Sequence, residues 1–350
     1  MKKNVTLSSP KKERMQKNGQ RNLYWDILRG IAMLLVVLGH AGLARESLLN
    51  RAIYAFHMPL FMLISGFFFH FSLQRHSFRE NLRRKALQLL LPVLIIGTLY
   101  YLITADHGVP LREMPGNYYA VLIRTLWFLQ ALFLSCLAVL VIHRVFRSDL
   151  WRFLACLALC IIFLFVPDFA CSTGAKFLFP CFVAGLYLNR CGLVQTFRSM
   201  PGRTCLTIVL IAVFGVLLHF FPFSRTFYNT TVYLFSGIDA PGALLFDDIF
   251  RVVIGLSGSF AAMALLYELY SRLPQKGPVT AFLSLLGRNT LAFYCIHVYL
   301  NELWLYLYRP VFPSSWPYVV LYFLICTAVC LFLTLGYNSL KKFLFPQKKR

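Results

Sequence analysis

Acidic side chains are scarce in this chain of 350 residues: Asp and Glu together number 13, against 35 Lys and Arg. Charged residues of both signs make up only 14% of the chain, whereas 59% of the residues are hydrophobic and the mean hydropathy is +0.65. A single soluble core cannot hide that much apolar surface behind so little charge. The composition therefore argues against an ordinary soluble domain and indicates a chain embedded in a lipid bilayer.

The basic excess gives a formal net charge of +22, which in a soluble protein would indicate nucleic acid or another polyanion as partner. Here the Lys and Arg residues fall between apolar runs, where such residues set membrane topology and contact anionic lipid. We therefore expect the lipid bilayer as a partner and no nucleic acid.

Motifs for metal binding and for soluble-enzyme chemistry are missing. The ten cysteines lie mostly inside apolar runs without C-x-x-C or Cys/His ligand spacing, so we read them as small core hydrophobes and expect no metal. Neither a phosphate-cradling glycine loop nor a nucleophile elbow is present. No apolar stretch followed by a small-residue cleavage site occurs near the start, so a cleaved signal peptide is not expected.

Ten runs are long enough to cross a bilayer, for which about 20 mostly apolar residues are needed. They cover residues 23–43, 52–72, 85–104, 118–142, 150–167, 173–189, 204–222, 244–269, 279–300 and 316–340. No connecting loop is long enough for a soluble domain, and no internal repeat is visible. The sequence thus predicts an all-α, polytopic membrane helix bundle of about ten transmembrane helices.

Loop charge tests this count independently. With alternate loops assigned to the cytoplasm, 25 Lys and Arg fall inside, 6 outside and 4 within runs. This asymmetry supports the count of ten and predicts that both termini are cytoplasmic. The expected division is a basic tail over residues 1–22, one membrane domain over residues 23–340 and a second basic tail over residues 341–350.

The first run contains two ionisable residues, Arg29 and His40, although such residues are costly inside a bilayer and usually face a bundle interior or a wet cavity. Eleven residues of helix separate them by about 16 Å along the axis and by only about 20° around it. Both side chains are therefore expected on one face, with Arg29 nearer the cytoplasm. Taken alone, each has a structural alternative: a histidine that packs between helices, and an arginine that snorkels to the interface. Asp26, one turn before Arg29, is expected to pair with it.

The surrounding residues resemble acyltransferase family 3, a family of bacterial membrane O-acyltransferases. The resemblance rests on Arg29-x10-His40 within L-R-G-I-A-M-L-L-V-V-L-G-H, on F-H-M-P-L-F-M-L-I-S-G at residues 56–66, on L-W-F-L-x-A-L-F at residues 126–133, and on S-L-L-G-R-N-T-L-A-F-Y-C-I-H at residues 284–297. The resemblance covers the first two runs well and the fourth and ninth moderately. For the other runs it rests on the number of helices, which is also ten in that family.

The resemblance implies transfer of an acyl group, usually acetyl from cytoplasmic acetyl-CoA, to a hydroxyl of a surface glycan or lipid-linked sugar. It also implies that His40 is essential and that Arg29 works with it. Histidine is suited to accept a hydroxyl proton near neutral pH. The sequence is compatible with His40 as a general base and equally with His40 as a covalent acyl carrier.

Arg83, Arg84 and Lys85 form a cationic cluster at the start of the third run. An unpaired helix N-terminus also favours anions, so the cluster is a candidate site for the phosphates of CoA. The family's Arg-x-Arg motif at this place is absent, and Arg83/Lys85 is its nearest equivalent. Anchoring of the helix end at the cytoplasmic face explains the cluster equally well.

A second polar group is expected at the outer ends of the runs, on the side of His40. Its candidate substrate-binding members are His57, Trp127, Asp248, Arg251 and His297, and Arg124, Asp247 and Glu302 lie beside them in the sequence. The functional interpretation is an acceptor pocket, with Trp127 as a flat surface for a sugar ring. The alternatives are structural: Arg251 can pair with Asp248 within its helix, and His57 can be a polar partner near Pro59 at a helix start.

Two other classes of function stay open. A transporter or exporter of a glycan or small anion would use the same intramembrane charges to line a path. A regulatory or scaffold membrane protein would leave Arg29 and His40 without a task.

Overall fold

The computed structural model describes residues 22–43, 47–104, 113–124, 126–165, 174–221, 241–272, 274, 277–308 and 316–344. Within these ranges every regular element is a helix and none is a strand, which confirms the predicted all-helical class. The predicted tail at residues 1–22 lies outside the described residues except for Asn22, and residues 345–350 of the other predicted tail lie outside them as well, so the predicted domain limits stay a prediction.

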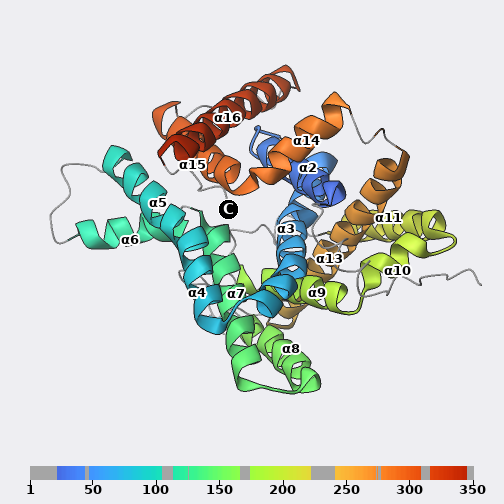
Figure 1. Cartoon of the computed structure of the whole chain (residues 1–350). Coiled ribbons are helices and arrows are strands. Elements are labelled where there is room, and N and C mark those ends of the chain that lie inside the picture. Colours follow the sequence, from blue (N-terminus) through green and yellow to red (C-terminus); the bar gives the residue numbers. More distant parts are fainter. Residues whose placement is uncertain are drawn as a thin grey trace, which may run out of the picture.

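The helices of the described part follow one another along the chain in this order: α2 (Leu23–Gly39), α3 (Leu48–Arg75), α4 (Phe78–Lys85), a π-helical turn η1 (Ala86–Leu90), α5 (Leu91–Thr104), α6 (Met114–Arg124), α7 (Trp127–Val145), α8 (Asp149–Phe165), α9 (Ala175–Arg190), α10 (Leu193–Ser199), α11 (Arg203–His219), α13 (Pro241–Arg272), α14 (Pro278–Arg288), α15 (Thr290–Tyr308) and α16 (Trp316–Leu344). Helix α3 packs against α2, α7, α9 and α13, and α14, α15 and α16 gather beside α2 (Figure 1).

A close helix crossing joins α3 and α9 through two glycines. A side chain at Gly66 would overlap the backbone carbonyl of Phe182, and one at Gly185 would overlap that of Leu63. Small residues of this kind let helix backbones approach where no hydrophobic effect drives membrane helices together. A second pair, Gly30 of α2 and Gly287 of α14, makes the same kind of crossing.

The outer faces of several helices are apolar and exposed, as lipid-facing surfaces are. Examples are Leu102 of α5, Ile161 of α8, Ile208 of α11 and Phe332 of α16. Five described helices are long and apolar enough to cross a membrane, and the number rises to seven when each of two bent helix pairs counts as one span. The chain is therefore a multi-pass membrane protein in its architecture, while the predicted count of ten spans and the cytoplasmic termini stay predictions.

Three predicted runs differ most from the helices of the structure. The run at 118–142 is wrong as a single helix, because α6 ends at Arg124 and α7 begins after Leu126, which has a left-handed backbone (φ 55°). The run at 279–300 is likewise two helices, α14 and α15, bent by 77° at Asn289. Helicity of the third run starts at Phe78, not at residue 85, because Ser77 and Glu80 form a capping box. Hydropathy sums apolar character and does not register such caps and breaks.

Candidate active site

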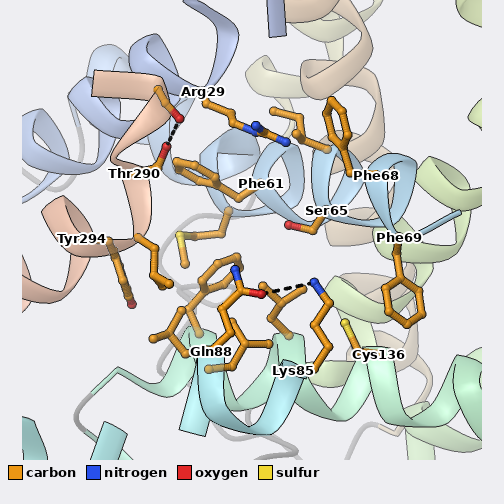
Figure 2. A pocket seen from close by; sticks show the side chains of 18 of the residues that line it. Arg29, Phe61, Ser65, Phe68, Phe69, Lys85, Gln88, Cys136, Thr290 and Tyr294 are labelled. Carbon is orange, nitrogen blue, oxygen red and sulfur yellow. Dashed lines mark hydrogen bonds between the residues drawn. The ribbon is translucent and has the colours of Figure 1, made fainter. Parts of the chain in front are cut away.

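A cavity of about 300 Å³ lies between α2, α3, the α4–η1 junction, α7, α14 and α15. Three of its lining side chains are cations, Arg29, Lys85 and Arg288, and none of the described lining residues is a carboxylate. In Figure 2, Arg29 reaches in from one wall and Lys85 from the opposite wall, with Ser65 between them. Such an arrangement suits an anionic ligand.

Arg29 is held at the cavity by two contacts. Its guanidinium carbon lies 4.2 Å from the centre of the Phe68 ring, and one nitrogen lies 3.9 Å from the buried carboxylate of Asp26. The predicted pairing with Asp26 is confirmed. Because the side chain of Arg29 is 26% exposed, its charge remains accessible from the cavity.

Arg288 is a cavity residue that the sequence analysis did not select. It ends α14, donates from Nε to the carbonyl of Ser284 at 3.1 Å, and is exposed. Gly30 follows Arg29 and Gly287 precedes Arg288. The close crossing of α2 and α14 at these glycines therefore explains why Arg288 lies at the same cavity as Arg29. In the sequence, an arginine next to a glycine within an apolar run was the signal that could have identified Arg288 as a candidate site residue.

The predicted cationic cluster divides in the structure. Lys85 lines the cavity and lies 3.5 Å from the amide oxygen of Gln88. It is the last residue of α4, immediately before the π-helical turn, and such turns frequently mark functional sites. Arg83 and Arg84 are exposed and are not among the lining residues; Arg84 donates to Nε2 of His76 at 2.7 Å.

His40 follows the last residue of α2 and is exposed. Its Nδ1 donates to the carbonyl of Val36 at 2.8 Å, and Val36, two helical turns after Arg29, also lines the cavity. With the proton held at Nδ1, a neutral ring keeps its lone pair on Nε2, the nitrogen that can act as a base. The cavity thus connects the cations to the helical turn that carries His40.

Two of the predicted acceptor residues lie close to His40. The rings of His40 and His297 make an edge-on contact with centroids 5.2 Å apart. His57 is buried, donates from Nδ1 to Ile53 at 2.7 Å, and contacts Tyr54, whose hydroxyl donates to the carbonyl of Gly39 at 3.2 Å. Three histidines from α2, α3 and α15 therefore gather where α2 ends.

The remaining acceptor residues form a separate group around the start of α9. Asp248 pairs with Lys176 at 2.9 Å, and both side chains are buried. The guanidinium of Arg251 lies 4.4 Å from the ring centre of Phe177, and Trp127 packs beside Gly174 in the same place. Sequence reasoning missed Lys176, because a pairing between α9 and α13 depends on how those helices pack. The predicted pairing of Asp248 with Arg251 stays a prediction.

Comparison with known proteins gives one family and partial matches to individual relatives. A family model described as "Acyltransferase domain" matches residues 22–335. The nodulation protein NolL of Mesorhizobium japonicum is 32% identical over 143 residues, which are 37% of this chain and 38% of that protein. The nodulation protein NolL of Sinorhizobium fredii is 41% identical over 83 residues, 21% of this chain and 23% of that protein. The matched part thus spans well under half of either relative.

Proposed function

The chain belongs to the acyltransferase domain family, and from that premise we propose that it is a membrane O-acyltransferase. It moves an acyl group, most simply acetyl, from cytoplasmic acyl-CoA to a hydroxyl of a cell-surface polysaccharide or lipid-linked glycan, in the bacterial cytoplasmic membrane. The observation that carries the proposal is the cationic cavity that extends from Arg29, Lys85 and Arg288 to Val36, the residue whose carbonyl holds His40.

The donor end of the cavity fits the phosphates of CoA. All three cations are at least partly accessible, and Arg and Lys bind phosphate oxygens through charge-assisted hydrogen bonds. A volume of about 300 Å³ is at the small end for a ligand cavity. The cavity therefore holds the thioester end of acyl-CoA, while the nucleotide stays at the edge formed by the three cations.

His40 supplies the chemistry in this proposal. Its Nε2 takes the proton of the acceptor hydroxyl, the hydroxyl oxygen attacks the thioester carbonyl, and the C–S bond breaks to release CoA as a thiol after protonation. The hydrogen bond from Nδ1 to Val36 supports this role because it fixes which nitrogen is basic. The exposure of His40 supports access for a large acceptor. An acyl carrier on the same nitrogen uses the same geometry.

The acceptor side rests on the group around α9. Trp127 offers an aromatic surface, and Arg251, Lys176 and Asp248 offer polar contacts close to it. Such a combination suits a sugar ring, which is apolar on its faces and polar at its edge.

A transporter is the second candidate, because the two bent helix pairs favour it. The chain turns by 63° between α9 and α10 and by 77° between α14 and α15, and broken helices often build substrate sites in transporters. A transporter moves its substrate without consuming acyl-CoA, so chemistry separates the two functions.

The deciding experiment measures acyl transfer in proteoliposomes that contain the purified protein, acetyl-CoA labelled in the acetyl group, and glycan from the source cells. We expect labelled glycan and one free CoA thiol per acetyl transferred. His40→Ala should abolish both signals, and the exposed histidine of α11, changed in His219→Ala, is the matched control. Transfer that persists in His40→Ala would refute the assignment of His40, and glycan uptake without CoA release would favour the transporter.

A further inference from the structure

Helices α15 and α16 bring polar side chains together on two facing stripes. His297 and Asn301 are one turn apart on α15, and Tyr322, Cys326 and Cys330 are successive turns on one face of α16. The hydroxyl of Tyr322 donates to the side-chain oxygen of Asn301 at 2.9 Å. One turn further along, His297 meets Cys326, and Cys330 lies beside Cys326.

The distances within this group match those of metal ligands. Nδ1 of His297 lies 3.3 Å from Sγ of Cys326, and the two sulfurs lie 3.9 Å apart. All three ligand atoms fall within 4.8 Å of one another. Around a tetrahedral zinc ion, two thiolates lie about 3.8 Å apart and a thiolate and an imidazole nitrogen about 3.5 Å apart, given Zn–S near 2.3 Å and Zn–N near 2.0 Å.

The surroundings also suit zinc. His297 and Cys330 are both 0% exposed, and an isolated charge at such a place is costly. Two thiolates and one dication sum to zero, so the complete site is a neutral unit. Soft thiolate ligands with an imidazole select zinc over magnesium or calcium. The expectation of no metal rested on the absence of C-x-x-C or Cys/His ligand spacing, whereas Cys326 and Cys330, four residues apart, share a face of α16.

We propose that His297, Cys326 and Cys330 bind one zinc ion, with a fourth position open to water or a further donor. The ion joins α15 to α16 and holds the His297 ring in its edge-on contact with His40. With Nδ1 on the metal, the His297 proton resides on Nε2, an atom that is buried without a hydrogen-bond partner among the described residues. His297 then acts as a positioning residue for His40.

The test is the metal content of the detergent-purified protein, measured by mass spectrometry after incubation with zinc and removal of the excess. We expect one equivalent in the wild type, and a loss of most of it in Cys326→Ser and in Cys330→Ser. Cys295→Ser is the matched control, because Cys295 is also buried and lies on α15 two residues from His297. This variant should keep the full equivalent.

A second measurement needs no variant. Cobalt loaded into the metal-free wild type should give a thiolate-to-cobalt absorption band in the near ultraviolet, and zinc should displace it. Wild-type protein that stays metal-free in excess zinc and gives no such band would overturn the proposal. Zinc retained by the Cys326→Ser/Cys330→Ser double variant would overturn it too, because the metal would then have other ligands. Neither readout depends on acyl transfer.

Discussion

Gly30 of α2 and Gly287 of α14 lie at a helix crossing so close that a side chain at either position would overlap backbone of the other helix. The overlapping groups are the carbonyls of Leu283 and Asp26. Arg29 and Arg288, the sequence neighbours of the two glycines, both line the cationic cavity. The geometry of the proposed donor site thus depends on two residues that have no side chain.

Substitution at this crossing should separate the helices. We expect Gly30→Ala and Gly287→Ala each to lower stability by about 1–3 kcal/mol, the usual cost of overpacking, and to raise the KM for acyl-CoA because the two arginines move apart. Thermal unfolding in detergent and donor kinetics measure the two effects.

Gly215→Ala is the control for this change, because nothing lies within 4 Å of the added carbon on α11. It should keep or slightly raise stability, since alanine is the better helix former. Equal melting temperatures for all three variants would contradict the close crossing.

Arg288 is expected to contribute to donor binding. Arg288→Ala should raise the KM for acyl-CoA about tenfold, the effect of losing a charge-assisted hydrogen bond worth about 1.4 kcal/mol. The turnover number at saturating donor should change little, because Arg288 is proposed to contact the phosphates and not the reacting carbonyl. Initial rates over a range of acetyl-CoA concentrations separate the two parameters.

Arg144→Ala is the matched control, since this arginine is exposed at the end of α7 and does not line the cavity. A KM that rises equally in both variants would indicate a general charge effect and not a site.

The three basic residues before the π-helical turn should differ in effect. Lys85 lines the cavity, whereas Arg83 and Arg84 are exposed and do not. We expect Lys85→Ala to raise the KM for acyl-CoA about tenfold, and Arg83→Ala and Arg84→Ala to change it less than about twofold, as exposed charges usually do. The same kinetic series checks this. The opposite order would return the donor contact to Arg83 and Arg84, in the last turn of α4.

Much of the fold could be predicted from hydropathy, because the apolar length of a helix is a local property. The runs at 52–72 and 316–340 correspond to α3 and α16, and the pairing of Asp26 with Arg29 followed from helical spacing alone. The break at Asn289 could have been found, since Asn followed by Thr is a capping signal inside an apolar run.

The candidate site was harder to predict because its residues come from helices distant in sequence. Spacing placed Arg29 and His40 on one helix, but the contact of His40 with His297 depends on how α15 packs. Likewise, Arg288 reaches the cavity through the glycine crossing, and Lys176 reaches Asp248 across two helices. A single sequence shows which residues are candidates, and tertiary packing decides which of them meet.

The buried pair of Lys176 and Asp248 allows stability to be separated from acceptor binding. Lys176→Ala leaves the Asp248 carboxylate buried without this partner and should cost about 3–5 kcal/mol of stability. The double variant Lys176→Met/Asp248→Leu removes both charges at similar volume and should recover most of that loss. We would measure thermal unfolding of the single and double variants, and then the acceptor kinetics of the double variant. If the pair binds the acceptor, the double variant folds but needs several-fold more glycan for half-maximal rate. A stable double variant with wild-type acceptor kinetics would show that the pair serves the packing of α9 on α13 alone.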